Sequence, residues 1–412
     1  MMRTAVLALA VCASVAAADD PAGGYEVDDV LVLEGSAHAA GLNARGRYSS
    51  TLPRSLAGRR AVGEGDGPMP AGVIAFSGEG GERVDVLLEY SGRAVASVLP
   101  AGVRRGRLLW SGLTLGDEPP GPLAAALPAE HWLEGVRAAA EGLTVRTGTA
   151  AERVLLYDVE LDASPEVGLA VEGDAWRVLN RGRRPVSAAA ALRPAGEGRW
   201  RLGVAGDVPA APDEKPAEEP EDGETKVDED SVGARVVSAA VDAAKEAAGM
   251  PAAKPKPKEG PAAEAALTFG EPLSAEEAAA AYADLLPGVT GAGRAHLEAV
   301  VRSRLSADAA LLAYRLAPDE HARLMPIEVT PAAAAVRRTA VVLVPDADPS
   351  IGDRVEALVA QLGDDAWARR EAATAQLRQL GRAAEPALKA ALTNEDPEIA
   401  DRAKRLVDEL KP

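Results

Sequence analysis

The chain has 412 residues, enough for about two to four domains, and 47% of them are hydrophobic although only 3% are aromatic. Much of this apolar fraction is alanine, and buried apolar surface contributes only about 25 cal/mol per Å², so several small cores are expected rather than one large core. The formal net charge of −18, with no Lys/Arg-rich stripe, argues against nucleic-acid binding, because phosphates repel an acidic surface.

The N-terminus has the pattern of an export signal. Arg3 precedes an apolar run, Thr4–Val15, that is too short to cross a bilayer, and small residues follow at Ala16–Ala18. We therefore predict a cleaved signal over residues 1–18 and a periplasmic or extracellular protein. Lipid attachment at Cys12 is the disfavoured alternative, because a valine precedes this cysteine where a lipoprotein signal normally has glycine, alanine or serine.

Cys12 is also the only cysteine, so cleavage of the signal would leave the chain without a thiol. Disulfides, cysteine nucleophiles and cysteine-ligated zinc are then excluded, and packing and hydrogen bonds must stabilise the fold. No later stretch approaches the roughly 20 apolar residues of a membrane-spanning helix, so no span is predicted.

Residues 25–209 have the pattern of a β-sandwich-rich body. In Arg83–Gly92, apolar and polar residues alternate with a period of two, which indicates a strand with one buried face. A helix is expected to interrupt the strands at residues 128–140, and Asn180–Gly182 predicts a tight turn. The other expected strands are Val30–Leu33, Gly72–Gly78, Ala94–Pro100, Gly106–Leu115, Arg153–Leu161, Val167–Gly173, Ala175–Gly182, Val186–Arg193 and Arg199–Gly206.

Residues 210–265 predict a disordered, acidic linker rich in alanine, proline and lysine. Asp213–Asp230 contains ten acidic residues and two lysines, a net charge of −8, with prolines interspersed. Such a segment cannot bury enough apolar surface to offset the entropy of ordering its backbone. The chain is therefore expected to have folded parts on both sides of this segment.

Beyond the linker, residues 266–345 predict a small α+β unit. Ser274–Glu277 has the pattern of a capping box and opens a helix, and Gly293–Leu305 predicts a second helix. Strands are expected within Ala309–Ala317 and Arg323–Pro331, and at Arg337–Pro345.

Residues 350–412 predict four amphipathic helices, and glycines at positions 363 and 381 suit the ends of the first two. The side chains expected to face inward are Val355, Leu358, Val359, Leu362, Trp367, Ala373, Leu377, Leu380, Pro386, Leu388, Leu392, Ile399, Ala403, Leu406 and Leu410. The expected fold class is thus a multidomain α+β chain with a helical C-terminal part.

The segments "DDAWARREAATAQLRQLG" and "AAEPALKAALTNEDPEIADRAKRLVDEL" resemble HEAT-type repeats of the short, PBS-lyase-like bacterial kind. An acidic turn precedes the first helix, Leu380–Gly381 ends it, Pro386–Leu388 opens the second helix, and Asp396–Pro397 starts the next unit. Trp367 and Ile399 are 32 residues apart. The resemblance implies stacked helices with a polar flank. It covers about 50 residues, or about one and a half to two repeats, whereas about three repeats are usually needed for a stable fold.

A looser resemblance covers most of the chain outside the linker. It rests on "RVLLYDVEL", "VLNRGRRPV" and the longer segments Met69–Gly102 and Leu311–Val344. Through these segments the chain resembles a group of uncharacterised exported bacterial proteins. That resemblance implies no activity.

Few residues suggest chemistry. The four histidines, His38, His131, His296 and His321, form no metal-binding pattern and are expected at the surface or half-buried. The sequence also contains no nucleophile elbow, phosphate-binding loop, dinucleotide fingerprint or EF-hand loop.

Two groups of residues favour an enzyme only weakly. Asp85 with Glu89, and Asp158 with Glu160, are carboxylate pairs of the kind that serve hydrolysis, but they are expected on a solvated sheet face. Glu130–Trp132 places an acid, an imidazole and an indole together, although a helix start with the indole in the core is the favoured interpretation.

We therefore expect an exported, non-enzymatic interaction or scaffold protein without cofactor or metal, in which HEAT-like helices contact an unknown protein partner. The alternatives are an envelope hydrolase, and a carbohydrate-binding sandwich module with exposed indoles. Trp110, Trp176 and Trp200 lie on apolar strands and are expected in the core instead. The expected partner-contact residues are Arg369, Arg370, Gln376, Arg378 and Gln379.

Overall fold

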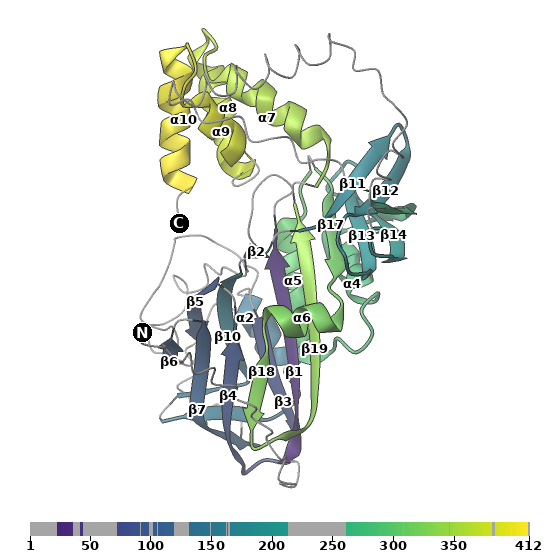
Figure 1. The fold of residues 1–412 in the computed structure, drawn as a ribbon, viewed down its shortest axis with the longest axis vertical. Coiled ribbons are helices and arrows are strands. Elements are labelled where there is room, and N and C mark those ends of the chain that lie inside the picture. Colours follow the sequence, from purple (N-terminus) through teal and green to yellow (C-terminus); the bar gives the residue numbers. More distant parts are fainter. Residues whose placement is uncertain are drawn as a thin grey trace, which may run out of the picture.

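The computed structural model describes residues 23–35, 42–43, 72–90, 92–98, 102–104, 106–118, 132–148, 150–161, 163, 165–212, 261–307, 309–345, 347–380 and 384–410. This part of the chain is a mixed α/β protein with large β-sheets (Figure 1). The predicted signal, Cys12, His38, Glu130, His131 and most of the predicted linker lie outside the described residues.

The largest sheet has ten strands, drawn from both halves of the sequence. Its order is β16–β14–β13–β17–β19–β1–β2–β10–β3, with β5 also paired to β10 and β1 also paired to β3. The strands are β1 (Gly23–Glu34), β2 (Leu42–Asn43), β3 (Gly72–Gly78), β5 (Gly92–Val98), β10 (Val154–Leu161), β13 (Val186–Pro194), β14 (Trp200–Val208), β16 (Thr268–Leu273), β17 (Leu311–Arg315) and β19 (Ala333–Val344).

The long strands β1 and β19 form the parallel centre of this sheet, with Val30 opposite Thr339 and Leu31 opposite Ala340. Both faces of β1 are covered, because Val30 belongs to one hydrophobic cluster and Leu31 to another. Residues about 310 positions apart in sequence are therefore neighbours. The two units expected at residues 25–209 and 266–345 thus share one sheet, a pairing that no local sequence pattern indicates.

A second sheet of six strands covers one face of the first. Its order is β18–β4–β7–β8–β9, with β6 paired to β7. Its strands are β4 (Arg83–Glu89), β6 (Gly102–Arg104), β7 (Arg107–Gly116), β8 (Thr144–Thr147), β9 (Ala150–Glu152) and β18 (Ile327–Thr330). The two sheets share one hydrophobic cluster, in which the Trp110 ring meets the Tyr157 ring edge-on at 6.3 Å.

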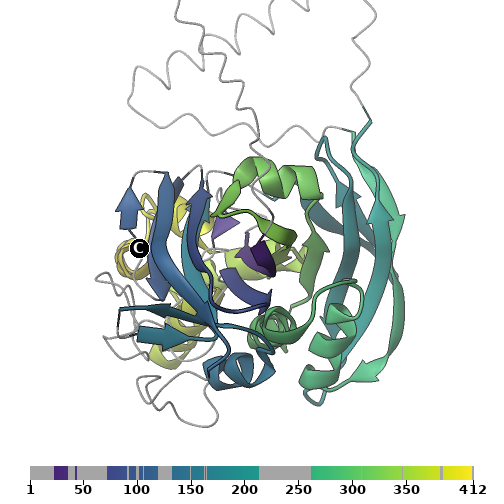
Figure 2. The same cartoon turned by 90° about the horizontal axis from the view of Figure 1, so that it is seen from below.

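The period of two predicted in β4 is confirmed, since Val84, Val86 and Leu88 are buried while Arg83 and Asp85 are exposed. Seen from below in Figure 2, blue N-terminal strands lie to the left of β1, and the teal strands β13 and β14 lie to its right.

A third sheet has three strands, β11 (Val167–Glu172), β12 (Ala175–Asn180) and β15 (Ala263–Ala266). β15 includes residues that the sequence pattern assigns to the linker, so the predicted end of that segment is wrong. None of its alanines is fully buried. The strand is held by backbone pairing with β12, in which Ala263 is opposite Asn180.

Helices cover the other face of the ten-stranded sheet. α4 (Ala275–Ala283) begins with the predicted capping box, in which Ser274 and Glu277 each accept a hydrogen bond from the other's backbone N–H. α5 (Gly291–Arg304) lies directly on β1, because an added Cβ on Gly293 would be 2.4 Å from Val30 Cγ2. α2 (Trp132–Ala139) falls within the predicted 128–140 helix, and α6 (Pro318–Leu324) crosses β19 on the opposite face (Figure 1).

The C-terminal helices α7 (Ser350–Gln361), α8 (Trp367–Leu380), α9 (Glu385–Ala391) and α10 (Pro397–Leu410) form a unit of their own (Figure 1). We call them the helical tail. Their buried side chains form a separate hydrophobic cluster, to which only Ala309 contributes from elsewhere among the described residues.

Most of the predicted inward residues of the tail are buried, but two predictions are wrong. Trp367 is 65% exposed and Leu392 is 40% exposed. The exposure follows from where the two residues lie: Trp367 is in the first turn of α8, and Leu392 comes just after the end of α9. Ile399, which also lies in the first turn of its helix, is buried because the end of α7 near Gly363 covers it.

Candidate functional site

The predicted partner-contact residues on α8 divide into two groups. Arg370 donates to the Asp364 carbonyl at 2.6 Å, Gln376 accepts from Arg354 at 3.3 Å, and Arg378 binds Glu409 at 2.8 Å. These three side chains therefore stabilise the tail itself. The side chain of Gln379 lies outside the described residues.

Arg369 forms the second group by itself. Its side chain is 73% exposed and makes an ion pair with Asp364 at 3.3 Å. It lies two residues after the exposed Trp367, at the same end of α8. We call Trp367 and Arg369 the tail tip. Arg369 is the predicted contact residue that internal ion pairs leave most accessible. Trp367 is not among the contact residues expected from the sequence.

A second arginine joins α8 to α10. Arg402 is 8% exposed and binds Glu371 at 2.7 Å and Glu398 at 2.6 Å. Together with the Arg378–Glu409 pair, it fixes the polar flanks of the two helices against each other. The tail is thus held by a hydrophobic core and by ion pairs at its edge.

A group of four polar side chains lies where β1, β10, β19 and α6 meet, and all but the arginine are almost fully buried. The Asp29 carboxylate accepts hydrogen bonds from the Tyr157 hydroxyl at 2.8 Å and from Arg338 Nε at 2.9 Å. Arg338 also donates to the Met325 carbonyl at 2.7 Å and lies 3.1 Å from His321 Nε2. Asp29, Tyr157, His321 and Arg338 are called the buried cluster below.

The backbone explains why these side chains meet. Asp29 is opposite Arg338 in the β1–β19 register, and on the other side of each strand the neighbouring pair Asp28–Arg337 is exposed. Gly72 makes room for the fourth member, because a Cβ there would lie 1.8 Å from Cζ of the Tyr157 ring. The sequence contains a signal for this arrangement, two acids in one apolar strand and two arginines in another.

Burial shifts the pKa values of two members of the buried cluster, His321 and Tyr157. It lowers the pKa of His321 to about 4, with the positive charge of Arg338 as the next cause, so the imidazole is neutral at pH 7. Burial also raises the pKa of Tyr157 well above its ordinary value. His321 is expected from the sequence at the surface or half-buried, and that prediction is wrong: it is 2% exposed, and His296 is fully buried as well.

The neutral His321 predicts acid sensitivity. An unfolded imidazole takes up a proton below about pH 6.5 while the folded one stays neutral to about pH 4, so the unfolded state binds more protons across this window. The free energy of unfolding should therefore fall by about 3 kcal/mol as the pH drops from 6.5 to 4. The charged groups that act on the imidazole are Arg338 on β19, Asp29 on β1 and Arg315 on β17.

Urea denaturation at several pH values measures this effect, with His321→Gln as the control because glutamine does not titrate. The wild-type chain should lose about 3 kcal/mol more than the variant across the window. Parallel pH curves for the two proteins would show that the imidazole is not held neutral.

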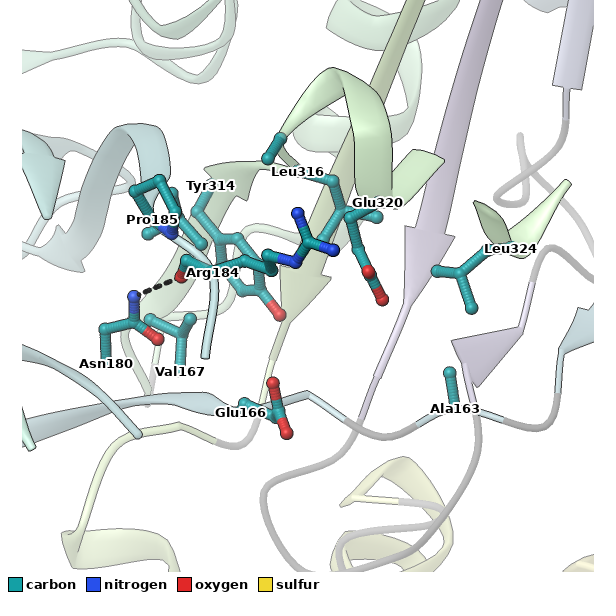
Figure 3. Close-up of a pocket in the computed structure, with 12 residues that line it drawn as sticks. Ala163, Glu166, Val167, Asn180, Arg184, Pro185, Tyr314, Leu316, Glu320 and Leu324 are labelled. Atoms are coloured by element: carbon teal, nitrogen blue, oxygen red, sulfur yellow. Dashed lines mark hydrogen bonds between the residues drawn. The ribbon is translucent and has the colours of Figure 1, made fainter. Parts of the chain in front are cut away.

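A pocket opens beside α6, and we call it the α6 pocket (Figure 3). Its volume is about 460 Å³ including the part open to solvent. Its walls come from the β10–β11 connection, the β12–β13 turn, the end of β17 and α6. The residues that line it are Ala163, Glu166, Val167, Asn180, Arg184, Pro185, Val186, Tyr314, Leu316, Ala317, Glu320 and Leu324.

The polar groups of this pocket converge from different elements. In Figure 3 the Tyr314 hydroxyl points toward Glu166, and Arg184 and Glu320 extend into the same space. Asn180 shapes the turn behind them, since its amide donates to the carbonyls of Arg184 at 2.8 Å and Pro209 at 2.7 Å.

The carboxylate pairs that the sequence singles out lie on β4 and β10, and the side chain of Glu160 is outside the described residues. Asp158 is fully buried, so its expected place on a wet face is wrong. Asp85 accepts the Gly112 N–H at 2.5 Å, and Glu89 pairs with Arg107 at 2.7 Å. Trp110 is buried as predicted.

Within the described residues, no three histidine, cysteine, aspartate or glutamate side chains are grouped so that they could hold a metal ion. None of the helices in the described ranges combines the length and apolar character that a membrane crossing requires. The tail tip and the α6 pocket are two candidate sites among the described residues.

Comparison with known proteins adds no relative. No protein-family model matches the chain, and neither a curated protein nor a solved structure is significantly similar to it. The resemblances described from the sequence therefore stay predictions.

Proposed function

We propose that this chain is an exported interaction or scaffold protein of the cell envelope, which contacts a protein partner through its helical tail. In this proposal α7–α10 are HEAT-like repeats carried on a sandwich-like body of facing sheets, and the chain catalyses no reaction. The observation that carries it is the 65% exposed Trp367 on a helical unit that has its own core.

Repetition within the tail supports the HEAT-like interpretation. Asp364 and Asp396 are 32 residues apart, and each accepts the backbone N–H two residues later, at 2.8 Å and 2.9 Å. The same spacing relates Trp367 to Ile399. Ile399 is covered by the end of α7 near Gly363, and a partner would cover Trp367 in the same way.

The chemistry of the tail tip also fits a protein partner. Tryptophan and arginine are among the residue types most enriched at hot spots, the few interface residues that contribute most of the binding energy between proteins. Trp367 supplies a large apolar surface, and Arg369, two residues later in the first turn of α8, supplies an exposed guanidinium. A protein surface with an apolar depression and a carboxylate at its rim would match this pair.

Affinity capture from envelope fractions tests the proposal with three proteins: the full chain, a chain truncated after Pro349, and Trp367→Ala. We expect the truncated chain to lose the partner, and Trp367→Ala to weaken direct binding of the recovered partner at least tenfold, because truncation of such an anchor costs about 2 kcal/mol or more.

Leu392→Ala is the matched control, since it also removes an exposed apolar side chain of the tail but lies at the end of α9 and is not part of the tail tip. Its binding should equal that of the unchanged chain. Recovery of identical partners by the full and the truncated chains would show that the tail is not the contact element.

A further inference from the structure

We propose that the α6 pocket binds the ammonium group of an alkyl amine, a binding activity separate from the tail contact. The pocket brings together a phenolic hydroxyl, two carboxylates and an apolar wall, contributed by four segments of the chain. Each of these features corresponds to one part of such a ligand.

Tyr314 gives the strongest indication of a ligand. The residue is only 2% exposed, and its hydroxyl has no hydrogen-bond partner among the described residues, although it points into the pocket (Figure 3). The hydroxyl is thus placed to make its hydrogen bond with a molecule that enters the pocket. Burial and, secondly, the charge of Glu166 raise its pKa well above the ordinary value, so it is a neutral group able to accept a hydrogen bond from an ammonium.

The charges in the pocket select a cation. Glu166 and Glu320 contribute two carboxylates against the single guanidinium of Arg184, a formal charge of −1. Arg184 is already paired with Asp319, which leaves little positive charge for an anion. Glu320 also binds Arg323, so Glu166 is the carboxylate most available to a ligand.

The remaining wall suits an aliphatic stem. Val167, Pro185, Leu316 and Leu324 present apolar surface around the polar end. A short alkyl chain attached to the ammonium would bury apolar area there and leave its far end at the mouth of the pocket. Both a free amine and a lysine side chain have this chemistry.

Ligand-observed NMR on the full-length protein tests the proposal with three probes of similar length: n-butylammonium, butyrate and n-butanol. We expect saturable binding of butylammonium with a millimolar dissociation constant, and no saturation by butyrate or butanol. Nα-acetyl-lysine methylamide carries the same ammonium on a peptide unit. Tighter binding of this probe would assign the site to a lysine side chain, and weaker binding would assign it to a free amine.

Glu166→Gln and Tyr314→Phe should each weaken butylammonium binding about tenfold or more, since each removes one hydrogen-bond acceptor of a charged donor. Glu172→Gln is the matched control, because Glu172 is an exposed carboxylate outside the pocket, paired with Arg177. Glu166 is exposed, so its variant tests the proposal even if Tyr314→Phe fails to fold. Saturation by butyrate or butanol, or unchanged butylammonium binding by Glu166→Gln, would overturn the proposal.

Discussion

Replacement of Arg338 by methionine is expected to lower the free energy of unfolding by about 3 to 5 kcal/mol. The substitution keeps an aliphatic stem of similar length but leaves the fully buried Asp29 carboxylate with only the Tyr157 hydroxyl as a close hydrogen-bond donor among the described residues of the buried cluster. A charge without a counter-charge inside a protein is costly because water no longer solvates it. Urea denaturation followed by circular dichroism measures the loss.

Arg337→Met provides the matched control on the preceding residue of the same strand. Arg337 binds Asp28 at 2.6 Å and Glu26 at 2.8 Å, but all three side chains are partly exposed, so its loss should cost about 1 kcal/mol or less. The double variant Asp29→Leu/Arg338→Met should recover part of the loss, because no unpaired charge remains. Equal losses for Arg337→Met and Arg338→Met would contradict this account of the buried cluster.

The buried cluster and the α6 pocket share one helix. His321 of α6 faces the buried cluster, while Glu320 and Leu324 of the same helix line the pocket. The pocket wall is thus positioned by the approach of His321 to Arg338 on β19. Variants that disturb the buried cluster should therefore weaken ligand binding at the pocket even where the fold survives, which makes the exposed Glu166 the cleaner probe.

Local features of the fold were predictable because they depend on neighbouring residues. The alternation in Arg83–Gly92 indicates a strand with one buried face, and Ser274–Glu277 indicates a helix start. The parallel pairing of β1 with β19 was not predictable, because it joins segments about 310 residues apart and depends on their shared burial rather than on any local pattern. The sequence predicts separate folded units on either side of the acidic segment. The pairing of β1 with β19 shows instead that both parts contribute to one sheet.

The candidate sites were predictable only in part. Arg369 is among the expected contact residues, but Trp367 is expected in the core, because amphipathic periodicity cannot tell which end of a helix lacks a neighbour. The α6 pocket has no sequence motif, since its polar residues meet only through tertiary packing. The doublets Asp28–Asp29 and Arg337–Arg338 are the one sequence signal that could have indicated the buried cluster.

Leu377→Ala is expected to destabilise the helical tail by about 2 to 5 kcal/mol, because Leu377 is fully buried and its loss leaves a cavity. The tail has a small hydrophobic cluster, and among the described residues only Ala309 joins that cluster from the rest of the chain. A loss of this size approaches the whole stability of a unit of about 60 residues. The tail should then unfold separately, while the sheets keep their own clusters.

Hydrogen exchange followed by mass spectrometry distinguishes the two parts. In Leu377→Ala the amides of α7–α10 should lose protection, whereas those of β1 and β19 should keep it, because their strands belong to other hydrophobic clusters. Leu392→Ala is the same chemical change at a 40% exposed position and should leave both parts protected. If Leu377→Ala instead lowered protection equally in β1 and β19, the tail and the sheets would form one cooperative unit. Truncation after Pro349 would then disturb the sheets as well, and failure of the truncated chain to bind its partner would no longer identify the tail as the binding element.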